Sequence, residues 1–182
     1  MKHVCVFLAD GFEEIEALTV VDVLRRAKIR VETVSLNGDD TVQGAHWVDV
    51  KADSVFEEAD FDKVDMLVLP GGMPGTSNLQ KHKGFIRLLQ KFDKEEKWIA
   101  AICAAPSILG ALGMLKGRKA CCYPSYEENL EGAEVKEDAV VQDGHFITGR
   151  GMGKAVPFAL KLAEILAGKE KAEEIAKSII YD

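Results

Sequence analysis

The sequence has no long apolar run and no extended cluster of basic residues. No apolar stretch approaches the roughly 20 residues that a transmembrane helix needs, and a strand-like run begins directly after Lys2. The 23 basic and 30 acidic residues give a formal net charge of −7, and no basic run is longer than a pair such as Arg25-Arg26. We therefore expect a cytoplasmic protein that binds neither membranes nor nucleic acid.

Cysteine is scarce, and its spacing matches no known metal or disulfide framework. The four cysteines, Cys5, Cys103, Cys121 and Cys122, form no CxxC pair and keep no ligand spacing with the four histidines. Cys5 lies inside an apolar run that is typical of a core strand. This pattern indicates a reducing compartment and predicts neither a disulfide nor a metal site.

Repeats, linkers and low-complexity segments are also missing from the 182 residues. A chain of this length buries about 70% of its unfolded surface when it folds, which is enough for a sizeable core. We therefore predict one domain that spans residues 1–182.

Short apolar runs alternate with amphipathic segments along the chain. Apolar runs typical of buried strands occupy residues 3–9, 29–36, 65–69, 98–103 and 119–123. Helical spacing of apolar residues is found at 13–28, 83–97, 154–167 and 169–180, and hairpins are expected at 41–49 and 140–148. The order predicts an α/β fold with a doubly wound, mostly parallel sheet and helices on both faces.

The apolar run that ends at Cys103 leads directly into a helix start. Small residues and Pro106 follow, and apolar residues then recur at helical spacing from Ser107 to Leu115. Proline is well suited to a helix's first turn, because its missing N–H costs nothing there. Cys103 would point at the positive end of this helix, which lowers the pKa of a thiol. We predict a nucleophilic Cys103, with a buried core cysteine as the alternative.

Three other turn sequences follow expected strands: Asp10-Gly11, Pro70-Gly71-Gly72 and Gly149-Arg150-Gly151. Ligand sites in parallel sheets lie at the carboxyl ends of the strands. The turns and Cys103 should therefore meet at one edge of the sheet, which favours the functional interpretation of Cys103.

Glu16 falls on the apolar stripe of the first expected helix, which is formed by Val20, Val23, Leu24 and Ala27. A buried carboxylate is costly unless it is paired or protonated, so burial should raise the pKa of Glu16. A neutral glutamate could then donate a hydrogen bond to a thiolate. Glu13 lies about 60° around the helix and is a competing candidate, although it could simply complement the helix dipole. Glu14 is expected to face solvent.

Five segments carry a resemblance to a known family. They are Gly11-Phe12-Glu13-Glu14-Ile15-Glu16, Val21-Asp22-Val23-Leu24-Arg25-Arg26-Ala27, Leu67-Val68-Leu69-Pro70-Gly71-Gly72, Ala100-Ala101-Ile102-Cys103-Ala104 and Thr148-Gly149-Arg150-Gly151. The chain resembles the DJ-1/ThiJ/PfpI superfamily, specifically its DJ-1/YajL branch, nearly from end to end. The resemblance implies a flavodoxin-like α/β fold that is usually a homodimer. It also implies Cys103 as the elbow cysteine, a protonated Glu16, and an oxyanion pocket made by the N–H groups of Gly72 and Ala104.

Two departures from the family pattern bear on function. Peptidase-like members have a histidine directly after the elbow cysteine, whereas this chain has Ala104, so a Cys-His hydrolase is disfavoured. Members of the DJ-1 type bring a histidine to the cysteine from the segment before the last hairpin, whereas residues 131–136 contain none. His145, two residues into that hairpin, is expected to be a surface turn residue.

The resemblance implies a glyoxalase that needs no cofactor and no metal and converts methylglyoxal or glyoxal to a 2-hydroxy acid. The Cys103 thiolate would add to the aldehyde, the Gly72 and Ala104 N–H groups would hold the oxyanion, and Glu16 would move protons. Deglycation of glycated proteins or nucleotides would be the same chemistry on adducts. The alternative is a redox-sensing or chaperone-like stress protein that uses oxidation of Cys103. The expected partners are a small reactive aldehyde and a second copy of the chain, with Trp47 as the local signal for a homodimer.

Overall fold

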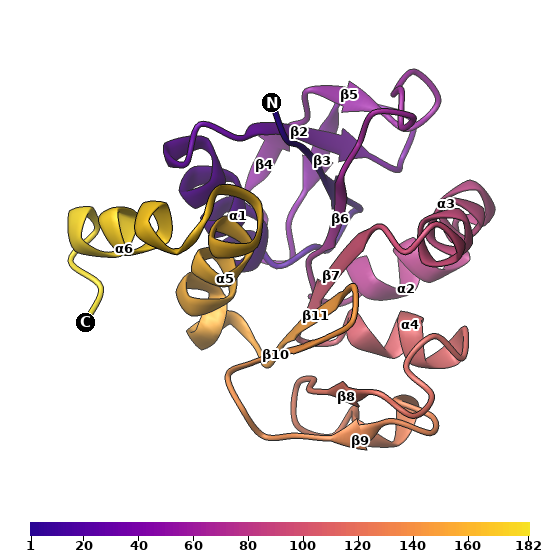
Figure 1. The fold of residues 1–182 in the computed structure, drawn as a ribbon. Helices are drawn as coiled ribbons and strands as arrows, with labels where there is room; N and C mark the ends of the chain where they lie inside the picture. The colour runs from indigo at the N-terminus through magenta and orange to yellow at the C-terminus, as the bar shows by residue number, and fades with distance from the viewer.

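The computed structural model describes residues 1–182 and is built around a seven-stranded sheet (Figure 1). The strands of this sheet are β1 (His3–Leu8), β2 (Arg30–Ser35), β5 (Ser54–Val55), β6 (Met66–Leu69), β7 (Trp98–Ile102), β10 (Val140–Asp143) and β11 (Phe146–Gly149). Their order is β10-β11-β7-β6-β1-β2-β5. Every neighbouring pair is parallel except the β10–β11 hairpin. The expected α/β fold with a mostly parallel sheet is confirmed.

Two small sheets lie outside the main one. The expected hairpin at 41–49 is present as β3 (Thr41–Gln43) and β4 (Asp49–Lys51), which pair antiparallel. The strand expected at 119–123 is wrong in extent, because β8 (Lys119–Ala120) has two residues and pairs only with β9 (Glu134–Val135). Beyond β8, the N–H of Cys121 donates to the Thr148 hydroxyl and the N–H of Tyr123 donates to the Cys103 carbonyl. The chain therefore crosses the end of the main sheet.

Helices cover both faces of the sheet (Figure 1). They are α1 (Glu14–Arg26), α2 (Gly75–Lys81), α3 (Lys83–Lys94), α4 (Pro106–Ala111), α5 (Ala155–Ala167) and α6 (Lys169–Ser178), with short 3-10 turns at Glu127–Asn129 and Met152–Lys154. Helices α1 and α5 pack on one face, and α2, α3 and α4 pack on the other. No helix is both long enough and apolar enough to span a bilayer.

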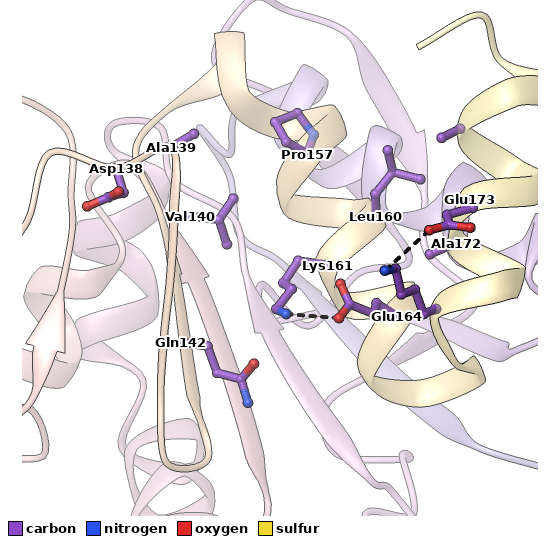
Figure 2. A pocket seen from close by; sticks show the side chains of 12 residues that line it. Asp138, Ala139, Val140, Gln142, Pro157, Leu160, Lys161, Glu164, Ala172 and Glu173 are labelled. Carbon is purple, nitrogen blue, oxygen red and sulfur yellow. Dashed lines mark hydrogen bonds and ion pairs between the residues drawn. The ribbon is translucent and has the colours of Figure 1, made fainter. Parts of the chain in front are cut away.

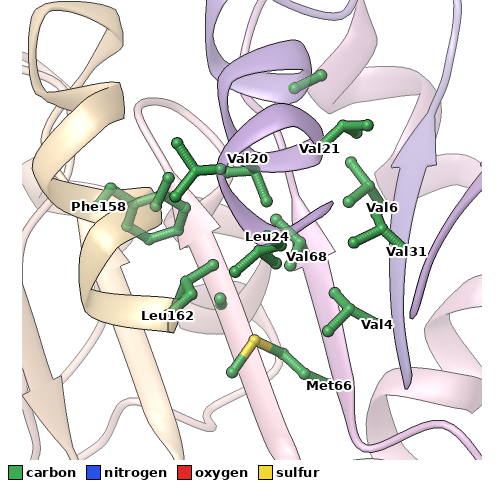
Figure 3. Close-up of a cluster of buried hydrophobic side chains, with 14 of the residues drawn as sticks. Val4, Val6, Val20, Val21, Leu24, Val31, Met66, Val68, Phe158 and Leu162 are labelled. Atoms are coloured by element: carbon green, nitrogen blue, oxygen red, sulfur yellow. The ribbon is translucent and has the colours of Figure 1, made fainter. Parts of the chain in front are cut away.

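The central strand β1 is buried on both sides, which explains its continuous apolar run. Val4, Val6 and Leu8 face the core formed with α1 and α5, part of which is drawn in Figure 3. Cys5 and Phe7 face the second core, against α3 and α4. Successive side chains of β1 therefore point alternately into two buried cores, so none of its positions faces solvent.

Helix α1 places its first turn at the carboxyl edge of the sheet. Glu13 caps the helix by accepting a hydrogen bond from the N–H of Ile15 at 3.3 Å. The expected apolar stripe packs against β1 and α5, and Glu16 on that stripe is only 1% exposed. The helix therefore carries a carboxyl group into the interior beside the strand ends.

Candidate active site

Cys103 lies at the corner between β7 and α4 in a backbone conformation that is rare for residues other than glycine. Its φ is 66°, in the left-handed region. Its N–H donates to the carbonyl of Gly149 at 2.9 Å, and its carbonyl accepts the N–H of Tyr123 at 2.8 Å. These bonds hold the strained elbow in place. Cys103 is partly exposed, whereas the other three cysteines are buried.

Two backbone N–H groups converge on the sulfur of Cys103. Those of Gly72 and Ala104 lie close enough to the sulfur to lower the pKa of the thiol, and they come from different segments, the turn after β6 and the start of α4. Gly72 has a φ of 88°, and a methyl group there would lie 2.5 Å from the N of Glu13. Only glycine fits this position, because both its backbone angle and its close contacts exclude a side chain. The structure thus brings together the donors named from the sequence.

Glu16 reaches the same point from α1. Its Oε2 accepts the N–H of Gly71 at 2.8 Å, while Oε1 is buried without a partner of hydrogen-bonding geometry. A methyl group at Gly71 would lie 2.6 Å from Cβ of Cys103 and 2.8 Å from Oε2 of Glu16, so all three residues are in close contact. The missing side chain at Gly71 is what lets the carboxyl and thiol groups approach.

The pKa shift of Glu16 agrees with the sequence-based expectation, whereas that of Cys103 differs from it. Burial raises the pKa of Glu16 to about 7, although the hydrogen bond from Gly71 and the nearby Cys103 thiol act to lower it. Burial and the Glu16 carboxylate raise the pKa of Cys103 to about 12, and the N–H groups of Ala104 and Gly72 only partly offset them. The expected depressed pKa of Cys103 is therefore wrong, because desolvation outweighs the helix terminus. Near neutral pH, Glu16 is placed to take the thiol proton.

Glu13 and Glu14 are occupied elsewhere. Glu13 caps α1 and lies 3.7 Å from Nδ1 of His46. The expectation that Glu14 faces solvent is wrong, because the β3–β4 hairpin covers this residue. The carboxylate of Glu14 accepts a hydrogen bond from the backbone N–H of His46 at 2.7 Å and lies 3.0 Å from Nδ1 of the same residue. Burial alone would raise the pKa of Glu14, but these hydrogen bonds from His46 lower it.

His145 is likewise not the surface turn residue expected from its place in the hairpin. It is buried, its ring packs on Phe146, and its Nε2 lies 2.8 Å from Oδ1 of Asp93 on α3. The residue therefore ties the β10–β11 turn to a helix that is distant in sequence.

One neighbour of the elbow carried no signal in the sequence. Tyr123 holds the Cys103 carbonyl through its N–H and keeps a half-exposed ring against Gly151, edge-on to Tyr126. Tyr123 is twenty residues from Cys103 and lies in a segment that was expected to be a strand. Its backbone thus fixes the Cys103 elbow, and its ring lies over the turn at Gly151.

A groove of about 540 Å³ lies away from this site, between α5, α6 and β10 (Figure 2). Lys161 pairs with Glu164 at 3.2 Å and Lys169 pairs with Glu173 at 3.7 Å along it. It contains no cysteine or histidine. The groove therefore offers no thiol or imidazole for covalent chemistry.

Alkylation of the folded protein is expected to modify Cys103 first. Cys5, Cys121 and Cys122 are at most 2% exposed, so they should react only after unfolding. Labelling with iodoacetamide for increasing times, followed by peptide mass spectrometry, measures the order. Equal labelling of all four thiols in the native protein would contradict the structure.

Replacing Gly71 with alanine is expected to lower the free energy of unfolding by about 1–3 kcal/mol, because the added methyl group forces the Cys103 and Glu16 contacts apart. Urea denaturation measures the change. Gly153→Ala is the matched control, since a methyl group there meets nothing within 4 Å. An unchanged urea midpoint for Gly71→Ala would show that the residues around Cys103 can move to accommodate the added methyl group without loss of stability.

Comparisons with known proteins agree with this architecture. The sequence model of the DJ-1/PfpI family matches residues 2–165. The chain is 41% identical to Protein dj-1beta of Drosophila melanogaster, over 98% of this chain and 97% of that protein. It is 32% identical to the glutathione-independent glyoxalase DJ-1 of Schizosaccharomyces pombe, over 98% of both. The crystal structure of Drosophila melanogaster DJ-1beta superposes with a TM-score of 0.95 at 40% identity, covering 100% of this chain and 98% of that one.

Proposed function

The chain belongs to the DJ-1/PfpI family, and on this basis we propose that it is a cofactor-independent glyoxalase that converts methylglyoxal or glyoxal to a 2-hydroxy acid. The observation that carries the proposal is the contact of Cys103 with Glu16 beneath the N–H groups of Gly72 and Ala104. A relative with 32% identity bears the name glutathione-independent glyoxalase. Adducts of the same aldehydes on proteins or nucleotides would be substrates for the same chemistry.

The first step adds the Cys103 sulfur to the aldehyde carbon. Glu16 takes the thiol proton as the S–C bond forms, and the carbonyl oxygen becomes an alkoxide held by the Gly72 and Ala104 N–H groups. Glu16 then returns the proton to that oxygen, which gives a hemithioacetal. A carboxyl group with a pKa of about 7 suits both directions of this transfer near neutrality.

The next steps isomerise the hemithioacetal and release the product. The Glu16 carboxylate removes the proton from the former aldehyde carbon, giving an enediolate. Glu16 then returns this proton to the neighbouring carbon. The hydroxyl proton of the former aldehyde oxygen passes to the oxygen on that neighbouring carbon, which leaves the thioester of the 2-hydroxy acid. Water hydrolyses this thioester and restores the Cys103 thiol. The oxidation of one carbon is balanced by reduction of its neighbour, so the reaction requires no external oxidant or reductant.

The proposal is tested with purified protein and methylglyoxal. We expect loss of methylglyoxal to be matched by an equal amount of lactate without added glutathione or metal. Prior alkylation of Cys103 should stop the reaction. Consumption of the aldehyde without lactate would mean simple adduct formation and would refute the proposed turnover.

A second candidate is a redox sensor in which peroxide oxidises Cys103. It is favoured by the exposure of this thiol alone among the four, and a structurally similar Toxoplasma gondii protein is described as oxidized. Oxidation of Cys103 to the sulfinate by peroxide, combined with no lactate formation, would support this alternative over the glyoxalase.

We also expect a homodimer, because exposed apolar side chains gather near the start of α1 and the β3–β4 hairpin. They are Ile15, Leu18, Trp47, Val48 and Met73. Light scattering at micromolar concentration should give twice the mass of the chain. Trp47→Glu should shift the protein toward monomer, whereas Ile180→Glu, at a site that is 87% exposed on the C-terminal tail, should not. A monomer mass for the unaltered protein would contradict this expectation.

A further inference from the structure

Three side chains of types that can ligate a metal lie close together at the end of the sheet opposite Cys103. His3 and Cys5 lie two residues apart on β1 and therefore point to the same face of the sheet. Glu32 on β2 is the register partner of Cys5. The imidazole, the thiol and the carboxylate consequently occupy one small region that is built from two paired strands.

The spacing of the three donor atoms suits one ion. A nitrogen of His3, Sγ of Cys5 and a carboxylate oxygen of Glu32 all lie within 4.8 Å of one another, and Nε2 of His3 is 3.1 Å from Oε2 of Glu32. Ligands about 2.0–2.3 Å from a tetrahedral zinc ion are separated by about 3.3–3.7 Å. The separations of up to 4.8 Å exceed these values by only about 1 Å, a change within the reach of side-chain adjustment.

The surroundings hold the donors in place. Cys5 is 1% exposed and His3 is 5% exposed, and Cys5 packs among apolar residues. The hydroxyl of Ser54 donates to Oε1 of Glu32 at 2.8 Å, which leaves Oε2 directed at His3. Such outer hydrogen bonds orient carboxylate ligands. Arg30 also approaches Oε2 at 3.3 Å, but its side chain is 63% exposed and can turn to solvent at little cost.

We propose that His3, Cys5 and Glu32 bind a single divalent cation of the zinc class. Thiolate, imidazole and carboxylate together suit Zn²⁺ and Co²⁺ better than Mg²⁺ or Ca²⁺, which prefer oxygen ligands alone. Binding forms the metal–sulfur bond as the Cys5 thiol releases its proton to solvent. A water molecule completes the tetrahedron.

The cation would join β1 to β2 and would not take part in the proposed aldehyde chemistry, because Cys103 lies at the opposite end of the strands. The proposed site differs from the sequence-based expectation of no metal. The pattern His-x-Cys followed by a glutamate 27 residues later matches no familiar spacing, and only the pairing of the two strands brings the donors together.

The test uses reduced, metal-free protein titrated with Co²⁺. We expect a thiolate-to-cobalt charge-transfer band that saturates at one equivalent and is displaced by Zn²⁺. Cys5→Ala should abolish the band, and Glu32→Gln should weaken binding by more than about 100-fold, since loss of an outer partner alone costs about 10- to 100-fold. Ser54→Ala, which removes such an outer partner, should weaken Co²⁺ binding by about 10- to 100-fold.

Two thiols serve as matched controls. Cys122→Ala alters another buried cysteine and Cys103→Ser alters the exposed one, and both variants should keep the band. Melting in the presence of EDTA shows whether each variant folds, and Zn²⁺ should raise the Tm of the unaltered protein but not that of Cys5→Ala. Absence of the band in the unaltered protein, or its loss in Cys103→Ser and retention in Cys5→Ala, would overturn the proposal. Neither result depends on the glyoxalase assay.

Discussion

Cys103→Ser is expected to lower the formation of lactate from methylglyoxal by at least about three orders of magnitude. A serine hydroxyl is a far weaker nucleophile than a thiol, so addition to the aldehyde should be much slower. The other thiols are buried and cannot replace the lost one. The measurement is steady-state turnover on matched amounts of protein.

The control for this variant is Cys122→Ser, which removes a thiol that does not contact Glu16 and should retain activity. Serine differs from cysteine by one atom, so the Cys103→Ser fold should keep its unfolding midpoint. Substantial lactate formation by folded Cys103→Ser would show that the reaction does not pass through a bond to this sulfur.

Glu16→Gln is expected to reduce turnover by about 10²- to 10⁴-fold, the usual contribution of a general base. Glutamine keeps an oxygen that can accept the N–H of Gly71, so the loss would report proton transfer and not a broken contact. Glu13→Gln is the matched control, because the Glu13 side chain caps the helix and is not the group proposed to take the proton of Cys103. Full activity in Glu16→Gln together with loss of activity in Glu13→Gln would show that Glu13, and not Glu16, is the general base.

The same residue should give a pH signature. Activity should rise as pH passes through about 7, because Glu16 must be ionised to accept the thiol proton. Its pKa in the folded protein is raised above the ordinary value of 4.5, so the folded state binds the proton more tightly than the unfolded state. The resulting stabilisation is fully present below pH 4.5 and is lost as pH rises through about 7.

The loss should amount to about 3 kcal/mol of unfolding free energy between these pH values. Urea denaturation of the unaltered protein and of Glu16→Gln gives the free energy of unfolding of each at pH 5 and at pH 8. The change between the two pH values in the unaltered protein, minus the change in Glu16→Gln, measures this loss. Equal pH dependence in both proteins would show that Glu16 is not the titrating group.

The main elements of the fold could be predicted from the sequence because strand burial and helix periodicity are local patterns. Glu16 was selected in the same way, since a carboxyl group on an apolar stripe is visible without knowledge of its partner. The pKa of Cys103 could not be predicted, because it depends on how fully the folded chain excludes water from the sulfur. Glu14 and His145 were misplaced for another reason, since their partners His46 and Asp93 are 32 and 52 residues away.

The two borders of the main sheet limit how copies of this protein can associate. One border is β5, which has two residues, and the other is β10, which has four and belongs to a tight hairpin. Strand-by-strand extension into a neighbouring molecule needs a longer row of unpaired backbone groups than either border offers. Extension of the main sheet from one copy into another is therefore disfavoured, and contacts made there should rest on side chains.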